Sequence, residues 1–315
     1  MTIQADDRTL GAVAAENRSS GKTSFSSASA WEIMRTGCSQ AGVDSADAKL
    51  IRLGENALFH APKAAVVVRI ARSGYGRDAL KEVNVARWLA ERNFPAAELY
   101  PVDQPITVDD HPVTFWKFID GRPGERRDIA TLGEVLRRLH GTRSPSSFNL
   151  PHAHMLGRVQ PRIEIAPIPK SDRSFLLDRL SELESKLPSL RFPLKPGPIH
   201  GDAHNENLMF RNEKAILIDF ERFAWGQPEW DLTMTATEYL TAGWWSTDEY
   251  QKFVDAYGYD VTSWHDGFDT LKAVNELTMT TWLMQNVDES TEIAAEYQVR
   301  MRTLRGEPSP GWRPF

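Results

Sequence analysis

Apolar residues recur at helical spacing in several stretches of the chain. From Asp78 to Leu89 they follow one another at intervals of three and four positions, which predicts an amphipathic helix. The pattern also predicts an amphipathic helix over residues 129–140 and a helix rich in paired charges over residues 175–187. Both later helices lie beyond residue 120, so we expect the carboxyl-terminal part of the chain to be mainly helical.

Short runs of β-branched and aromatic residues predict strands. The run at residues 64–70 is Ala-Ala-Val-Val-Val-Arg-Ile, and the run at residues 114–118 is Thr-Phe-Trp-Lys-Phe. Two further apolar runs, 208–210 and 215–218, flank the polar turn 211–214 and predict a hairpin.

The composition is that of an ordinary globular protein. Of 315 residues, 41% are hydrophobic and 25% are charged, which allows a substantial core. Cys38 is the single cysteine, so the chain has no internal disulfide framework. The polar opening, residues 1–30, lacks the apolar core of a signal peptide and is expected to be a disordered leader. With no apolar run of membrane length and no basic tract, we expect a cytoplasmic protein without membrane or nucleic-acid partners.

The strongest chemical signal is His-Gly-Asp-Ala-His-Asn-Glu-Asn at residues 200–207, followed by Ile-Asp-Phe-Glu at residues 218–221. This spacing suits phosphoryl transfer, which needs an Asp beside the attacking hydroxyl and two oxygen ligands for a divalent metal. Asp202 would orient the hydroxyl and take its proton. Asn207 and Asp219 would hold Mg²⁺ against the nucleotide phosphates, because hard oxygen ligands suit that ion.

These residues resemble the catalytic motif of the aminoglycoside phosphotransferase and choline kinase family, small-molecule relatives of the protein kinases. The likeness includes Gly-Gln-Pro-Glu-Trp-Asp-Leu at residues 226–232. It implies a bilobal, protein-kinase-like α+β fold and a nucleoside triphosphate donor, ATP or GTP. It also implies that His200, counted among the catalytic residues, and Asp231 both brace the catalytic loop, although Asp231 alone would equally fit a helix cap.

The resemblance assigns the nucleotide to the amino-terminal half. A kinase-like lobe needs a loop over the phosphates, a cation on a strand and a helical acid that pairs with the cation. Gly54 and Asn56 lie in the segment that fits the loop. Arg69 stands in the strand run, where the family has Lys or, quite often, Arg. Glu82 is the expected partner of Arg69, although a helical Glu is more often on a solvated face.

The same comparison divides the chain into two lobes. Residues 31–117 are expected to form a small, mostly antiparallel sheet with one important helix, and residues 118–307 a larger, mainly helical lobe. Residues 308–315 are expected to be an irregular tail. Trp116 and Phe118 mark the hinge between the lobes, where the backbone would meet adenine.

A glycine pattern at residues 74–79 offers a different interpretation. It reads Gly-Tyr-Gly-Arg-Asp-Ala, which fits a dinucleotide-binding fingerprint between a strand and a helix. However, the glycines begin several residues after the strand, and residues 93–98 supply no second strand that ends in an acid. A flexible connection between strand and helix fits better.

His200 and His204 raise the alternative of a metallohydrolase, because zinc ligands on a helix are commonly four residues apart. Gly201 and the preceding prolines place both histidines on a loop, where that spacing loses its meaning, and no third His or Cys cluster follows nearby. A hydrolase is therefore disfavoured.

Negative charge is concentrated towards the carboxyl-terminal end. Residues 221–300 hold 15 acids and 4 bases, a net of −11 in a chain whose total is −6. The resemblance places the acceptor beside this segment, where carboxylates would attract a cation and tryptophan faces would stack on a sugar or an ammonium group. Glu221, Trp230 and Asp231 are the candidate acceptor-binding residues. Taken singly, most such acids fit a solvated face and most such tryptophans a core.

We therefore expect an ATP- or GTP-dependent kinase that phosphorylates a hydroxyl of a small, amine-bearing molecule such as an aminoglycoside antibiotic or an amino sugar. Kinases of choline, homoserine or plain sugars are alternatives. A catalytically inactive nucleotide-binding module with a regulatory role is another. Intact Asp202, Asn207 and Asp219 argue against that last alternative.

Overall fold

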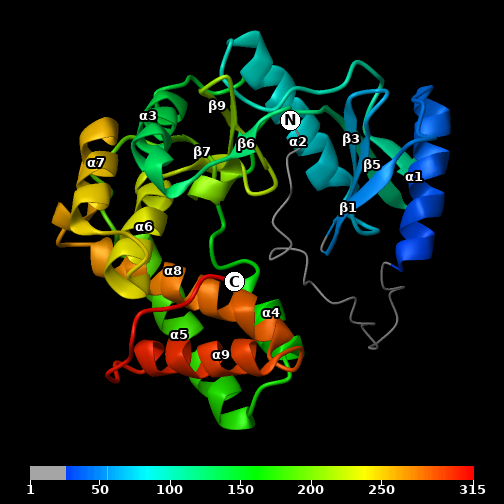
Figure 1. The fold of residues 1–315 in the computed structure, drawn as a ribbon. Helices are drawn as coiled ribbons and strands as arrows, with labels where there is room; N and C mark the ends of the chain where they lie inside the picture. Colours follow the sequence, from blue (N-terminus) through cyan, green and yellow to red (C-terminus); the bar gives the residue numbers. More distant parts are fainter. Residues whose placement is uncertain (1–25, 55) are drawn as a thin grey trace.

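The computed structural model describes residues 26–54 and 56–315. Its amino-terminal lobe, the N-lobe, contains one five-stranded sheet in the order β1-β2-β3-β5-β4, and every neighbouring pair of strands is antiparallel. Two helices lie on opposite sides of these strands (Figure 1). The elements are α1 (Ser27–Ala41), β1 (Lys49–Leu53), β2 (Ala57–Ala61), β3 (Val66–Ile70), α2 (Gly76–Glu91), β4 (Ile106–Val108) and β5 (His111–Lys117).

Strand β3 carries one charged residue, Arg69, on the face opposite its buried apolar side chains. Val66, Val68 and Ile70 are fully buried in the core that packs under α1. Because successive side chains of a strand point to opposite faces, Arg69 points away from that core, towards α2. The glycines at 74 and 76 lie in the connection from β3 to α2, and β3 has antiparallel neighbours on both sides, so the dinucleotide-fold alternative is excluded.

Helix α1 was not predicted. It begins at Ser27, within the segment expected to be a disordered leader, and Ser26 and Ser29 form a capping box at its start. Residues 1–25 of that expected leader lie outside the described residues. The helix buries small or polarisable side chains such as Ala30 and Cys38, which give a weak hydrophobic periodicity. Within the described residues it adds a second helix to the one important helix expected in the N-lobe.

The carboxyl-terminal lobe, the C-lobe, is mainly helical, as expected, and contains two small antiparallel sheets, β6-β8-β9 and β10-β7. It lies beside and below the N-lobe in Figure 1. Its elements are β6 (Arg122–Pro123), α3 (Ile129–His140), α4 (Val159–Ile165), α5 (Lys170–Lys186), β7 (Gly197–Ile199), β8 (Leu208–Arg211), β9 (Lys214–Leu217), β10 (Ala224–Gly226), α6 (Glu229–Thr237), α7 (Thr247–Tyr257), α8 (Phe268–Leu283) and α9 (Thr291–Leu304).

The predicted C-lobe elements match closely. Helix α3 has the predicted bounds, whereas α5 begins five residues earlier than expected. The β8–β9 hairpin is tighter than predicted, because Arg211 pairs with Lys214 and only Asn212 and Glu213 form the turn. Both turn residues have positive φ angles, 50° and 57°, as a two-residue hairpin requires. Among the described residues, no helix is long and apolar enough to cross a membrane.

The tail after α9 has no helix or strand, as predicted, but it is packed. Trp312 is only 3% exposed, and its backbone N–H donates to the oxygen of Ala242 at 3.0 Å. Its indole donates to Thr303 at 3.0 Å, and the guanidinium of Arg300 lies 4.7 Å from its ring. The tail therefore covers the helical lobe.

Aromatic rings connect the two lobes. Trp88 of α2 lies 6.0 Å from Phe223, Phe223 lies 6.2 Å from Phe220, and Phe220 lies 6.0 Å from Trp116 of β5. Trp88 and Phe220 are each 1% exposed. Since Phe220 follows Asp219, this packing fixes the segment of a predicted metal ligand against both α2 and β5.

Candidate active site

A buried carboxylate holds the catalytic loop that follows β7. Asp231, on the first turn of α6, accepts the backbone N–H groups of His200 at 2.7 Å and Gly201 at 2.8 Å, and the Nε2 atom of His140 lies 3.0 Å from it. Burial alone would raise the pKa of Asp231, but the hydrogen bond and charge of His140 outweigh burial and lower it. At 1% exposure Asp231 cannot contact an acceptor, so its predicted role in acceptor binding is wrong. Its hydrogen bonds to the loop are those expected of a residue that braces the loop.

Two other sequence candidates are also buried. His200 is 0% exposed, and its Nε2 atom lies 2.9 Å from the backbone oxygen of Ile218, one residue before Asp219. It therefore positions the chain instead of touching the reacting groups. Trp230 is 5% exposed within the C-lobe core, which contradicts its predicted contact with an acceptor.

The hairpin β8–β9 brings the two predicted metal ligands to one end. Leu208 pairs with Leu217, so the residues just outside this pair, Asn207 and Ile218, are adjacent, and the N–H of Ile218 donates to the oxygen of Asn207 at 2.9 Å. Asp219 follows directly. Its φ of 63° is unusual for a residue with a side chain, and such strain is often found at functional sites.

The oxygen atoms at this end suit a hard divalent cation. The amide nitrogen of Asn207 donates to the backbone oxygen of Asp202 at 2.8 Å and lies 3.0 Å from Nε2 of His204. With its nitrogen engaged, Asn207 presents its amide oxygen, and the Asp219 carboxylate is exposed to solvent. The Asp202 side chain is 35% exposed, open to an incoming hydroxyl. The donor set therefore fits Mg²⁺.

The predicted ion pair of the N-lobe is present. Arg69 of β3 donates through Nη1 to Glu82 of α2, and both side chains are largely buried. Burial raises the pKa of Glu82 to about 7 against the charge of Arg69, and the carboxylates of Asp219 and Glu221 add to the rise. The structure therefore brings together the strand cation, the helical acid and the metal loop.

Glu221 lies among cations instead of facing an acceptor. Its Oε2 atom accepts from Nη2 of Arg69 at 3.0 Å, and its Oε1 atom accepts from Nη2 of Arg158 at 2.5 Å. Burial would raise the pKa of Glu221, but the charges of Arg158 and Arg69 outweigh it and lower the pKa. Lys81 of α2 donates to the backbone oxygen of Glu221.

Arg158 and Lys81 were missed in the sequence. The one sequence feature that could have identified Lys81 is its position directly before Glu82, the predicted helical acid. Arg158 belongs to no motif, and its contact with Glu221 spans 63 residues of sequence, so the sequence does not indicate this contact.

The loop predicted to cover the phosphates connects β1 to β2. The N–H of Gly54 donates to the oxygen of Asn56 at 3.1 Å, which closes a tight turn. The Asn56 amide nitrogen lies 3.5 Å from Glu221, so this turn reaches towards the metal loop.

The predicted hinge residues Phe118 and Trp116 make contacts within the protein. The N–H of Phe118 donates to the oxygen of Ala65 at 2.8 Å, and its carbonyl oxygen accepts from Arg211 at 3.2 Å. The ring of Phe118 stacks on His60 at 3.9 Å, and the indole of Trp116 donates to Thr114 at 3.0 Å. The backbone N–H of Phe118 is therefore engaged within the protein, and the contact with adenine stays a prediction for the rest of the segment.

Further carboxylates lie near Asp202. Glu238 is 5% exposed and accepts from the indole of Trp245 at 2.7 Å. Burial raises the pKa of Glu238 to about 7, and the nearby charges of Glu206 and Asp202 add to the rise. Trp245 is half-buried, with the guanidinium of Arg126 5.3 Å from its ring. The sequence contained Glu238 and Trp245 only as members of an acidic, tryptophan-rich segment.

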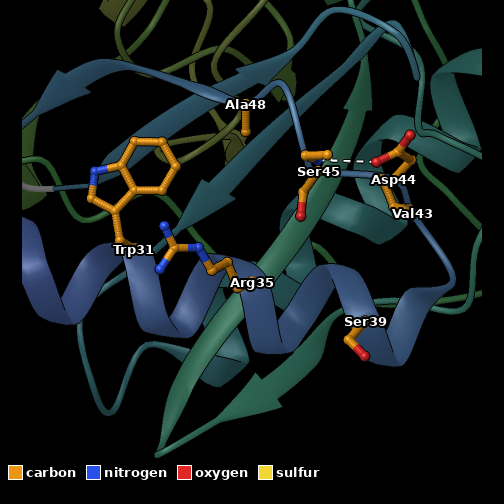
Figure 2. A pocket seen from close by; sticks show the side chains of 8 residues that line it. Trp31, Arg35, Ser39, Val43, Asp44, Ser45 and Ala48 are labelled. Atoms are coloured by element: carbon orange, nitrogen blue, oxygen red, sulfur yellow. Dashed lines mark hydrogen bonds between the residues drawn. The ribbon is translucent and has the colours of Figure 1, made fainter.

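The structure has one hollow between the two lobes and a second hollow within the N-lobe. A cavity of about 370 Å³ lies between α2 and α4, and its lining includes Arg69, Arg158 and Glu221. A second hollow of about 490 Å³ lies between α1 and residues 43–48 (Figure 2). Trp31 and Arg35 point into it from α1, with the guanidinium of Arg35 5.3 Å from the indole ring. Among the described residues that line this second hollow there is no candidate site residue.

Comparison with known families agrees with this arrangement. The sequence pattern of the phosphotransferase enzyme family (APH) matches residues 52–272, from strand β1 of the N-lobe into helix α8 of the C-lobe. The chain belongs to this family. This phosphotransferase is therefore a small-molecule kinase that uses a hydroxyl acceptor. No curated protein sequence matches it significantly.

Solved structures share the fold of the phosphotransferase. The amicoumacin kinase hAmiN, in complex with AMP-PNP, Ca²⁺ and Ami, superposes with a TM-score of 0.67 at 17% identity, covering 85% of this chain and 91% of that one. The GDP and kanamycin complex of APH(2")-IIia gives 0.63 at 14% identity, covering 87% and 98%. A choline/ethanolamine kinase family protein from Mesorhizobium loti gives 0.60 at 16% identity, covering 87% and 94%.

Proposed function

We propose that this phosphotransferase transfers the γ-phosphoryl group of ATP or GTP to a hydroxyl of a small, amine-bearing molecule, with aminoglycosides and amino sugars as the leading class. The observation that carries the proposal is the pair of solvent-accessible carboxylates Asp202 and Glu206, whose charges both lie near enough to the buried Glu238 to raise its pKa. Such a cluster favours a cationic acceptor over a neutral one.

The residues divide the chemistry between them. Asp202 is placed to accept the proton of the acceptor hydroxyl as the bond to phosphorus forms. Asn207 and Asp219 would hold Mg²⁺, which neutralises charge on the phosphates when bound. Arg69, fixed by Glu82, supplies a cation to the phosphates. Trp245, half-buried beside Glu238, offers an indole face for an ammonium group or a sugar ring.

The test is nucleotide turnover by the purified protein with a panel of acceptors. Aminoglycosides and amino sugars form one arm, choline and homoserine a second, and neutral sugars a third. We expect the first arm to stimulate turnover most strongly. Stimulation by neutral sugars alone would contradict the amine preference, and nucleotide binding without turnover for any acceptor would favour the inactive regulatory module.

Salt dependence sharpens the test. Salt limits the range of electrostatic attraction to about 8 Å at physiological ionic strength. The affinity for an aminated acceptor should therefore fall as salt rises, whereas the affinity for its amine-free analogue should not. Both are measured at saturating nucleotide, because triphosphate binding is itself electrostatic. Equal affinities and equal salt slopes for the two acceptors would contradict the proposal.

A further inference from the structure

Four charged side chains of alternating sign run from one lobe to the other. Glu82 of α2 pairs with Arg69 of β3, Arg69 pairs with Glu221 in the metal loop, and Glu221 pairs with Arg158 immediately before α4. Arg69 and Glu221 are 13% and 18% exposed at their side chains, so these contacts are largely removed from water. In such surroundings a carboxylate that loses its partners is destabilised.

This arrangement conflicts with the expected role of Arg69. Nη1 of Arg69 donates to Glu82 and Nη2 donates to Glu221, so a phosphate that approaches the remaining N–H groups at Nη2 meets the negative charge of the Glu221 carboxylate beside it. Glu82 is the more buried acid, with a side chain 6% exposed against 18% for Glu221. Glu221 is therefore the acid that a phosphate displaces from Arg69 more readily.

The two oxygens of Glu221 are held by different arginines, which makes this exchange feasible. Oε2 faces Arg69 and Oε1 faces Arg158. When Oε2 leaves Arg69, the carboxylate keeps its bond to Arg158. The cavity of about 370 Å³ borders all three side chains and gives the carboxylate room to turn.

We propose that Arg158 is a positioning residue that retains the Glu221 carboxylate and thereby releases Nη2 of Arg69 to the nucleotide phosphate. This inference rests on the proposed nucleotide-dependent function. Without Arg158, Arg69 is the one cationic side chain that contacts the carboxylate of Glu221 among the residues described here, since Lys81 contacts only its backbone oxygen, and the phosphate must compete for Arg69.

The test is calorimetric binding of Mg²⁺–nucleotide to the full chain and its variants. R158Q should bind roughly tenfold more weakly, a change typical of coupled sites. E221Q should have little effect alone but should restore affinity in the R158Q background to within about threefold of E221Q itself. R158K should keep most of the wild-type affinity, because it keeps the charge beside Oε1.

The effect of losing one positive charge on nucleotide affinity must be distinguished from the effect of losing the contact between Arg158 and Glu221. If only charge matters, the effects of R158Q and E221Q on nucleotide affinity should be additive. If Arg158 retains Glu221, E221Q should restore most of the affinity that R158Q loses, which is a non-additive effect. R72Q is the matched control, because Arg72 is exposed and lines the same cavity without a described contact to Glu221. It should lower affinity less than about twofold.

The outcomes are distinguishable. Unchanged affinity in R158Q, or no rescue by E221Q in a variant whose thermal unfolding is normal, would overturn the role of Arg158 while wild-type binding upheld the proposed function. R72Q as weak as R158Q would also overturn it, in favour of a general field. Wild-type protein that binds no metal–nucleotide complex would overturn both proposals.

Discussion

The carboxylate of Asp231 lies 2.7 Å from the backbone nitrogen of His200, and Asp231 is only 1% exposed. A buried carboxylate that satisfies backbone donors ties the first turn of α6 to the loop that carries Asp202. We expect Asp231→Asn to lower the free energy of unfolding by about 2–4 kcal/mol, because the new amide turns N–H groups towards donors. Denaturant unfolding measures this. Asp255→Asn, an exposed change on α7, is the control and should be nearly neutral.

Gly201 has a φ of 80°, and a Cβ at this position would overlap the backbone oxygen of Arg222. Gly201→Ala should therefore cost more stability than backbone strain alone. Gly258→Ala is the matched control, since Gly258 has a φ of 90° but open space around it and should cost about 1 kcal/mol. Equal destabilisation of the two variants would show that the overlap with Arg222 is relieved at little cost.

Glu238 should make stability depend on pH. Its pKa is raised from 4.5 to about 7, so between these values the folded protein binds the extra proton and the free energy of unfolding falls as pH rises. Glu238→Gln removes this ionisation and keeps an oxygen for Trp245. Its stability relative to wild type should be unchanged near pH 4 and rise by roughly 3 kcal/mol well above pH 7. A pH-independent difference would contradict the raised pKa.

The sequence predicted the elements whose signal is local. Helix α3 and the β8–β9 hairpin follow from periodicity and turn chemistry, and the fixed spacing of Asp202, Asn207 and Asp219 made the phosphotransferase motif visible. The pairing of Arg69 with Glu82 followed from the family resemblance and is confirmed by their contact.

Other features depend on contacts that the sequence does not encode locally. Arg158 contacts Glu221 across 63 residues, and nothing near Arg158 marks it. Trp230 belonged to an acidic, aromatic segment that suggested ligand binding, but folding buries it in the core. Phe118 belongs to the predicted hinge, but its backbone N–H donates to the oxygen of Ala65. Tertiary packing decided each of these outcomes.

Metal dependence tests the pair of oxygen ligands. Asp219→Ala removes a carboxylate from the site opposite Asn207, so nucleotide affinity should become insensitive to Mg²⁺ and turnover should be lost. Calorimetry with Mg²⁺ and then with a chelator measures this in the wild type and the variant. Wild-type nucleotide binding of equal strength in both conditions would show that Asn207 and Asp219 do not form a metal site.

The most direct test of the account is the rate of phosphoryl transfer by Asp202→Ala. Its side chain is 35% exposed on a loop held by other residues, so its removal should leave the fold and the nucleotide site intact. We predict that kcat falls by about 10²–10⁴ while nucleotide affinity changes little, because the variant lacks the group that orients the hydroxyl and takes its proton. A variant that keeps more than about a tenth of wild-type turnover would contradict the assignment of Asp202 as the catalytic residue.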